Sequence, residues 1–269
     1  MEALATRRGT ARPAGAYIDI DGVRTYYEVS GDGDPLILLH GGMCTAETWD
    51  AQAPALAAHY RVHVPERFGH GRTPDIDGPI TYENMAQHAI GFMEALGLES
   101  AHLAGWSDGA LVGLLVALRR PSLVGKLVLV DQFITLEGAP PWYLPFVNAM
   151  APDNLPPALV DTYASLSPDG GDHFPVVFDK LHRIFTTATG VELADLANVS
   201  SATLVIAGDG GAITLEHLAD VRRALPDSQV AVVPGTTHLL CQEKPHIVNQ
   251  LILDFLADEP APKMSGHEG

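Results

Sequence analysis

Gly105-Trp106-Ser107-Asp108-Gly109 follows a short apolar run at 101–104 and opens a helical pattern at 107–118. A serine on such a tight strand-to-helix turn projects its hydroxyl above the sheet, at the positive end of the helix. Glycines two residues before and two residues after it leave room for a strained turn and for close packing of helix on strand. The motif therefore predicts that Ser107 is a nucleophile. A five-residue match of this kind is common by chance, so the rest of the chain has to support it.

Short apolar runs alternate with longer helical patterns, which is typical of βαβ units and a mostly parallel sheet. Asp21-Gly22 is a strong hairpin turn, so we expect the first two strands to be antiparallel. The runs at 127–130 and 204–207 do not alternate with polar residues, which is typical of strands buried on both faces. The predicted fold class is α/β, with a mostly parallel eight-stranded sheet and helices on both faces. We expect strands at 17–20, 23–29, 35–39, 62–65, 101–104, 126–130, 203–207 and 229–233, and helices at 81–96, 107–118 and 248–256.

The stretch 134–190 has a different composition, rich in proline and aromatic residues with helical patches. We interpret it as a mainly helical cap inserted after the sixth strand, over the carboxyl edge where open α/β sheets bind ligands. Residues 15–133 and 191–257 would then form the core, and 1–14 and 258–269 flexible termini.

Composition excludes several classes of protein. The 269 residues are 46% hydrophobic and 18% charged, as in an ordinary globular domain. A formal net charge of −17 disfavours nucleic acid and anionic membrane surfaces as partners. No run of about 18 apolar residues and no signal-peptide core is present, and the two cysteines, Cys44 and Cys241, fit free thiols in a reducing compartment better than a disulfide. We expect a soluble, cytoplasmic protein.

Four stretches together resemble the α/β-hydrolase superfamily. They are Gly41-Gly42 after the third strand, the turn at 105–109, the loop at 65–73 after the fourth strand, and Gly235-Thr236-Thr237-His238 after the last strand. The resemblance runs from about residue 18 to residue 256. It implies the α/β-hydrolase fold and a serine hydrolase.

The resemblance also implies roles for individual residues. A serine hydroxyl needs a neighbouring base to become a good nucleophile, and His238 stands where the family places that base. Negative charge on a reacting carbonyl oxygen would be stabilised by the backbone amides of Asp108 and Gly42, with Met43 the alternative to Gly42.

The acid of the triad departs from the common family pattern. Most members carry it in a Gly-x-x-Asp turn after the penultimate strand, where this chain has Gly208-Asp209-Gly210-Gly211. Gly211 at the expected position cannot orient an imidazole. We favour Asp131, at the end of the strand after the nucleophile, which is similar to the acid of zearalenone-type lactone hydrolases. Asp209 is the alternative, since the triad rule specifies geometry and not chain order.

Residues beside Ser107 bear on the substrate. The turn is similar to that of valacyclovirase-type amino-ester hydrolases, which implies that Asp108 biases the site towards cationic or polar groups. A helix-capping role is the structural alternative. The expected apolar pocket consists of Met43, Trp106, Phe133, Trp142, Tyr143 and Leu239.

The leading hypothesis is hydrolysis of a medium-sized, fairly hydrophobic carboxylic ester or lactone through an acyl-enzyme on Ser107. The alternatives are a non-catalytic or slow-turnover small-molecule receptor, and a carbon–carbon bond hydrolase, thioesterase or perhydrolase with the same triad. No metal-ligand spacing or phosphate-binding glycine motif is present, so we expect neither metal nor cofactor. The expected partner is a small-molecule substrate, with neither nucleic acid nor membrane, and a homodimer is compatible with the sequence.

Overall fold

The sheet begins with the predicted hairpin. In the computed structural model, which describes residues 15–257, strands β1 (Gly15–Ile20) and β2 (Val23–Ser30) pair antiparallel. Asp21 and Gly22 between them both have positive φ, 51° and 85°, as a two-residue type I′ turn requires. The expected flexible termini, 1–14 and 258–269, lie outside the described residues.

The eight strands form one sheet in the order β1-β2-β4-β3-β5-β6-β7-β8. Strand β2 pairs antiparallel with β4, and every pair beyond β4 is parallel. The chain passes from β3 outwards to β4 and then crosses back to β5, so the direction of winding reverses between β3 and β5. Open α/β sheets bind ligands at such a switch point, outside the carboxyl ends of the strands. The remaining strands are β3 (Pro35–Leu39), β4 (Arg61–Pro65), β5 (Ala101–Trp106), β6 (Val124–Val130), β7 (Ala202–Gly210) and β8 (Ser228–Thr237).

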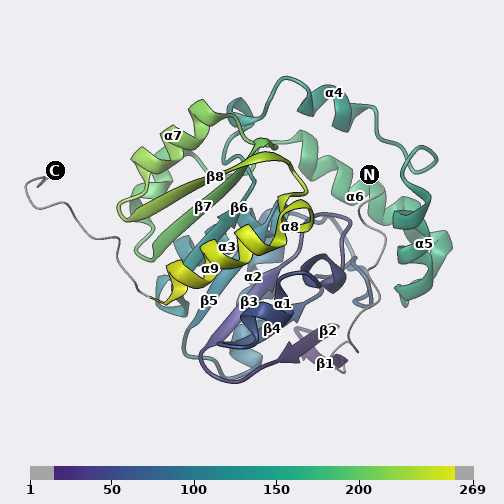
Figure 1. Ribbon diagram of the computed structural model, residues 1–269. Coiled ribbons are helices and arrows are strands. Elements are labelled where there is room, and N and C mark those ends of the chain that lie inside the picture. Colours follow the sequence, from purple (N-terminus) through teal and green to yellow (C-terminus); the bar gives the residue numbers. More distant parts are fainter. Residues whose placement is uncertain (1–14, 258–269) are drawn as a thin grey trace, which may run out of the picture.

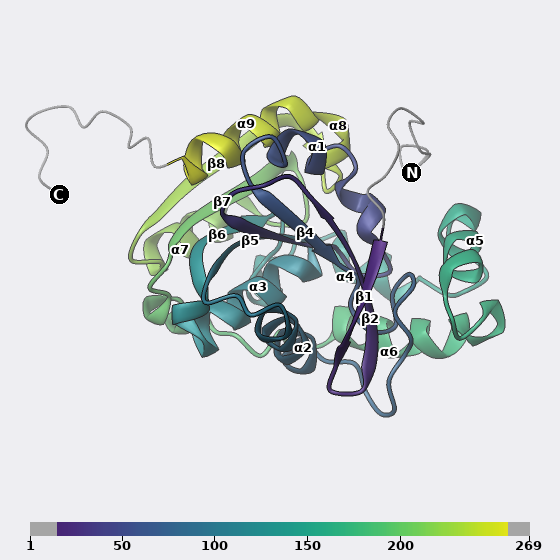
Figure 2. The ribbon, with the colours of Figure 1, turned by 90° about the horizontal axis from the view of Figure 1, so that it is seen from below.

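Helices cover both faces of this sheet, as predicted (Figures 1 and 2). One face carries α2 (Tyr82–Ala95), α3 (Asp108–Arg119) and α7 (Leu215–Ala224). The other carries α1 (Ala53–Leu56), α8 (Leu240–Glu243) and α9 (Pro245–Leu256), together with the short helix η2 (Ala46–Trp49). The predicted α/β fold is confirmed.

Strand β6 shows why its apolar run is continuous. Leu127 and Leu129 pack into the core on the α2–α3 side, and Val128 and Val130 into the core on the α9 side. Successive side chains of a strand point to opposite faces, so a strand covered on both faces needs apolar residues at every position.

Helix α2 begins and ends at the residues that the sequence indicates as its cap and its stop. Thr81 Oγ1 accepts from the Asn84 backbone N–H, and Asn84 Oδ1 accepts from the Thr81 N–H, which is a reciprocal capping box. Gly97 follows the last turn with φ +68°. The predicted helix at 81–96 is therefore confirmed to within one residue at each end.

The chain between β6 and β7 lies largely outside the three stacked layers. Figures 1 and 2 show α5 and α6 on one side of the molecule, beyond the sheet and its covering helices. Lys180 of α6 pairs with Asp75 of the loop after β4, with 2.6 Å between Nζ and Oδ2. The helices of this segment are η4 (Leu136–Gly138), α4 (Tyr143–Asn148), α5 (Pro157–Leu166), η5 (Gly171–His173), α6 (Phe174–Thr186) and η6 (Leu193–Asn198); η3 (Pro121–Leu123) precedes β6.

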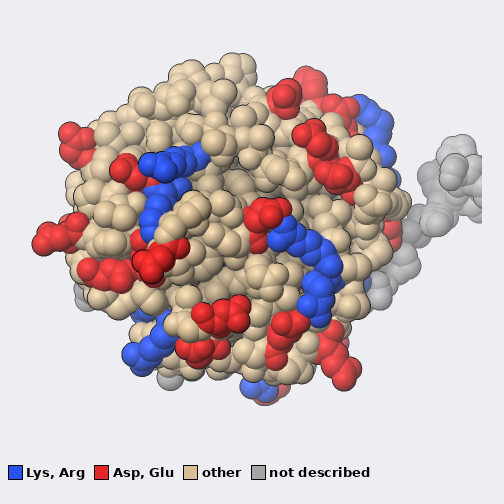
Figure 3. Space-filling model, turned by 180° about the vertical axis from the view of Figure 1, so that it is seen from behind, with Lys and Arg blue, Asp and Glu red and all other residues tan. Residues whose placement is uncertain are grey.

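Charged side chains are dispersed over one face of the molecule (Figure 3). On the face seen in Figure 3, acidic and basic groups alternate in small clusters with broad uncharged areas between them, and no continuous basic area is present there. Within residues 15–257, no helix is long and apolar enough to cross a membrane.

The two-sided burial of β6 predicts a large cost for truncating one of its side chains. Leu127 is 0% exposed, so Leu127→Ala should lower the free energy of unfolding by about 2–5 kcal/mol, from lost burial and the cavity left behind. Val232→Ala on edge strand β8, where the side chain is 41% exposed, is the matched control and should change it by less than about 0.5 kcal/mol. Urea denaturation measures both, and equal losses would contradict this account of the core.

Candidate active site

Ser107 occupies a strained turn between β5 and α3. Its backbone has φ +55° and ψ −128°, a conformation that non-glycine residues rarely adopt. A Cβ at position 105 would overlap the backbone of Gly109, and a Cβ at position 109 would overlap the Leu39 carbonyl. Glycine is therefore required at both positions, because the backbones of the turn, of α3 and of β3 lie too close together to leave room for a side chain.

The structure brings Ser107, His238 and Asp131 into one hydrogen-bonded chain. His238 Nε2 lies 3.0 Å from Ser107 Oγ, and His238 Nδ1 lies 2.7 Å from Asp131 Oδ2. A carboxylate only accepts, so Nδ1 carries the proton and Nε2 is left to accept from the serine hydroxyl. This is the arrangement in which an imidazole can take a proton from a serine.

Asp131 is held by backbone donors as well as by the imidazole. Its side chain is fully buried, Oδ1 accepts from the Gly208 N–H at 2.9 Å, and Oδ2 accepts from the Ala212 N–H at 2.7 Å. A buried carboxylate is costly unless hydrogen bonds satisfy it. These two amides and His238 fix the carboxylate in both position and orientation.

The absence of a side chain at Gly211 leaves room for the Asp131 carboxylate at the end of β6. A Cβ at position 211 would overlap Asp131 Oδ1. The space that a side chain after the penultimate strand would use is thus occupied by a carboxylate from β6. A glycine at 211 and an acid at 131 are two parts of the same arrangement.

Asp209 lies elsewhere. It is exposed, and its Oδ1 accepts from the Thr236 N–H at 3.0 Å, within the turn before His238. Bonds from the Gly235 and Thr236 amides lower the pKa of this carboxyl. Of the two acids left open by the sequence, the structure places Asp131 at the histidine and gives Asp209 a turn-stabilising position.

Trp106 connects the nucleophile turn to the histidine loop. Its Nε1–H donates to the His238 carbonyl oxygen at 2.8 Å, and the two rings lie 5.0 Å apart. The opposite part of the indole packs where a Cβ on Gly41 would lie. Trp106 is 4% exposed, so its position is that of a framework residue between loops.

Gly41 and Gly42 form a loop directly against Ser107. A Cβ on Gly41 would lie 3.3 Å from Ser107 Cβ, and a Cβ on Gly42 would overlap both Asp108 Oδ2 and the Phe185 ring. Among the described residues, no hydrogen bond uses the amide of Gly42 or Met43. The amide of Asp108, as the first residue of α3, has no intrahelical acceptor. The expected donors therefore lie unused beside the serine, and Met43 adds a strained φ of +55°.

The Asp108 side chain is buried, at 3% exposure, and one of its oxygens accepts from Tyr82 Oη at 2.7 Å. Its other oxygen, Oδ2, has no hydrogen-bond partner within residues 15–257. Burial raises the pKa of this carboxyl, and the Tyr82 bond and the charge of Arg67 oppose the rise. A preference for cationic substrates through Asp108 stays a prediction. The positive charge of Arg67 nearby already partly balances the Asp108 carboxylate.

The expected pocket residues fall into two groups. Met43, Tyr143 and Leu239 are half-buried, and Phe133 is buried with its ring 4.8 Å from that of Tyr143. Trp142 is 46% exposed, and its ring lies 6.1 Å from those of Tyr143 and Phe146 in tilted and edge-on arrangements, so it packs on the surface of the segment between β6 and β7.

Two side chains near the site, Arg67 and Tyr82, were not assigned to it from the sequence. Phe185 lies over Gly42, and its carbonyl accepts from Tyr143 Oη at 3.2 Å. Nothing in the local sequence distinguishes Tyr82 from core residues. Arg67 stands in a loop that also contains two glycines and a second arginine, so its local sequence does not single it out. Within residues 15–257, no three histidine, cysteine, aspartate or glutamate side chains are grouped as a metal site would require.

Comparison with known proteins agrees with this fold. The chain belongs to the alpha/beta hydrolase family, whose model matches residues 36–251. It is 29% identical over 247 residues to N-formylmaleamate deformylase of Pseudomonas putida, covering 84% of this chain and 90% of that protein. It is 27% identical over 263 residues to 2-hydroxy-6-oxo-2,4-heptadienoate hydrolase, also of P. putida, covering 88% and 94%.

Solved structures show the same fold. The meta-cleavage product hydrolase of Pseudomonas fluorescens IP01 superimposes with a TM-score of 0.79 at 24% identity, covering 91% of this chain and 98% of that one. The protein is thus a hydrolase of the alpha/beta family, and its relatives cleave different kinds of bond.

The hydrogen-bonded chain predicts that Ser107 is unusually reactive. A fluorophosphonate probe should label the wild-type protein at this one serine, because His238 can remove the proton as the hydroxyl attacks phosphorus. Ser107→Ala should abolish labelling, and Ser200→Ala, at an exposed serine outside the site, should leave it unchanged. In-gel fluorescence and peptide mass spectrometry measure the outcome, and equal labelling of Ser107→Ala and wild type would contradict the assignment.

Proposed function

We propose that this protein hydrolyses a medium-sized, fairly hydrophobic carboxylic ester or lactone through an acyl-enzyme on Ser107. The observation that carries the proposal is the relay from Ser107 Oγ through His238 to the buried Asp131 carboxylate. Such a relay generates a nucleophile for attack on a carbonyl carbon.

The steps follow from the positions of these groups. Ser107 Oγ bonds to the carbonyl carbon while its proton passes to His238 Nε2. The negative charge that develops on the carbonyl oxygen is stabilised by the amides of Gly42 and Asp108. The carbon–oxygen bond then breaks, and the leaving alkoxide takes the proton from His238. Water, deprotonated by His238, attacks the acyl group, and the acid leaves as the serine regains its proton.

The walls around the serine support an apolar substrate. In this proposal four half-buried hydrophobic residues that pack against the core line the substrate site: Met43, Tyr143, Phe185 and Leu239. Ligand sites of this kind are mostly apolar, with a few polar groups that fix orientation.

Carbon–carbon bond hydrolysis is the second candidate, because a relative along nearly the whole chain is named 2-hydroxy-6-oxo-2,4-heptadienoate hydrolase. A deformylase among the relatives adds amide cleavage. Thioesterase and perhydrolase chemistry would use the same relay, and a slow-turnover receptor would need only the pocket.

A substrate panel separates these candidates. Wild-type protein should turn over activated esters or lactones many times per molecule and faster than matched thioesters, amides and dienoic ring-fission ketones. Ser107→Ala is the blank for every substrate. Preferential cleavage of the ring-fission ketones would replace the ester proposal by carbon–carbon hydrolysis, and a single stoichiometric burst would indicate a receptor.

Two carboxylate variants test the role of the acid. Asp131→Asn should lower kcat by about 10,000-fold, because an amide can hold the imidazole in the wrong tautomer. Asp209→Asn removes a charge from the neighbouring turn without touching the histidine and should leave kcat within a few-fold of wild type. Both kcat values come from ester hydrolysis, with thermal melting to show that the variants are folded. Near-wild-type turnover by Asp131→Asn would overturn the assignment.

A further inference from the structure

We propose that Arg67 is a positioning residue that holds the Gly41–Gly42 peptide in the orientation needed to stabilise the oxyanion. The proposal rests on the acyl-transfer function above, and it assigns a role to a buried cation that the triad itself does not use.

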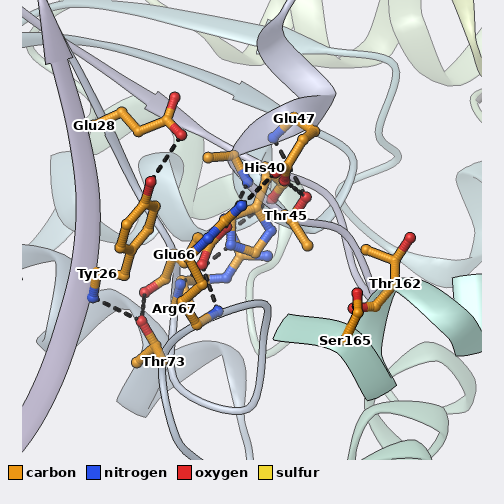
Figure 4. A network of polar contacts seen from close by, with 12 residues as sticks. Tyr26, Glu28, His40, Thr45, Glu47, Glu66, Arg67, Thr73, Thr162 and Ser165 are labelled. Atoms are coloured by element: carbon orange, nitrogen blue, oxygen red, sulfur yellow. Dashed lines mark hydrogen bonds and ion pairs between the residues drawn. The ribbon is translucent and has the colours of Figure 1, made fainter. Parts of the chain in front are cut away.

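The contacts of the guanidinium group are with the loop that carries the donor. Arg67 is 1% exposed; its Nη1 donates to the His40 carbonyl oxygen at 2.6 Å and its Nη2 to the Gly41 carbonyl oxygen at 3.1 Å. Figure 4 shows Arg67 beside His40, beneath the turn that carries Thr45 and Glu47. One planar cation thus binds two successive carbonyls of the loop.

Peptide geometry converts this contact into a constraint on the donor. In a trans peptide the C=O of one residue and the N–H of the next point in opposite directions. With the Gly41 carbonyl turned to Arg67, the Gly42 N–H points away from the guanidinium and is free of any acceptor among the described residues. A peptide between two glycines rotates with little steric penalty, so an outside group has to hold it. If it flipped, a carbonyl oxygen would replace the N–H and repel the oxyanion.

His40 adds a second hold on the same carbonyl. Its Nε2 accepts from the Arg67 backbone N–H at 3.1 Å, which leaves the ring proton on Nδ1, 2.7 Å from the Gly41 carbonyl oxygen. Burial, with the charge of Arg67, lowers the pKa of His40 well below its usual value. The ring is neutral and in the tautomer that donates to Gly41.

The cost of burying the guanidinium indicates that the arrangement is specific. A buried charge is unfavourable unless it is paired and hydrogen-bonded. The carboxylate that most strongly favours charged Arg67 is Asp108, whose own backbone amide is the other expected donor. The charge of Asp108 therefore opposes the fall that burial imposes on the pKa of Arg67, although among the described residues the two groups form no direct ion pair.

The test compares Arg67→Met with Arg72→Met in the same full-length protein. Arg67→Met keeps a long apolar stem but removes both bonds, and should lower kcat for ester hydrolysis by about 100-fold, the effect of losing one oxyanion donor. KM should change little, because the ground-state carbonyl depends less on the hole. Affinity for a boronic acid, which forms a tetrahedral adduct with the serine, should fall by a similar factor.

Arg72→Met is the matched control for damage to the loop. Arg72 lies five residues away in the same loop and pairs with the buried Glu66 at 2.6 Å, but it contacts no carbonyl of the Gly41–Gly42 loop among the described residues. It should lower thermal stability while kcat and boronic acid affinity stay within a few-fold of wild type. A purely structural role for Arg67 would make the two variants alike.

Arg67→Lys keeps the charge and covers the case in which Arg67→Met does not fold. The lysine ammonium lies one bond closer to the backbone and cannot make both bonds, so kcat should fall at least about 10-fold at similar KM. Wild-type kcat and boronic acid affinity in either folded variant would overturn the proposal. A wild-type protein without ester hydrolysis would count against the proposed function instead, and boronic acid binding would still report on the orientation of the loop.

Discussion

Two backbone hydrogen bonds at the end of the parallel sheet hold the reacting groups together. The Ser107 N–H donates to the Val130 carbonyl at 3.0 Å, and the Asp131 N–H donates to the Ile206 carbonyl at 2.7 Å. Each bond continues the ladder between neighbouring strands one residue beyond the strand end. Because β5, β6 and β7 are parallel and in register, their carboxyl ends meet at one edge, and the nucleophile and the acid leave the sheet side by side.

Backbone strain is concentrated at residues that follow the carboxyl ends of these and neighbouring strands. Ser107, Asp131 and Met43 all have φ between +50° and +55°, an unfavourable region for residues with a Cβ. Such conformations persist only where the surroundings determine them. Here the surroundings are the sheet ladder and the glycines whose missing side chains make room, so the rigidity of the sheet maintains the geometry of the site.

The region beneath the nucleophile is unusually polar for a protein core. His40, His70, Arg67 and Asp108 are all buried there, and burial lowers the pKa of His70 to about 3. Neutral histidines act as hydrogen-bond donors and acceptors without the cost of a charge. The cluster orients backbone groups of the loops above it, which connects the packing of the core to the electrostatics of the reacting centre.

Much of this architecture was readable from the amino-acid sequence, because its signals are local. Periodicity predicted the order of strands and helices, Asp21-Gly22 the hairpin, and Gly105–Gly109 the turn that carries Ser107. The small-residue loop before His238 pointed to the base through its place after the last strand. These features depend on residues that are neighbours in the chain.

Tertiary structure decided what depends on distance between segments far apart in the chain. The sequence favoured Asp131 and left Asp209 as the alternative, and the overlap of a Cβ at 211 with Asp131 shows which one fills the space beside His238. Arg67 had no local signature, since its partners are carbonyls 26 and 27 residues away. Trp142 fitted an apolar pocket by composition yet lies exposed on the surface of the segment between β6 and β7. The sequence by itself determined the fold and pointed to Ser107 and His238 as the candidate nucleophile and base. The partners of each buried charge were decided by three-dimensional packing, because hydrogen bonding and steric exclusion act through space.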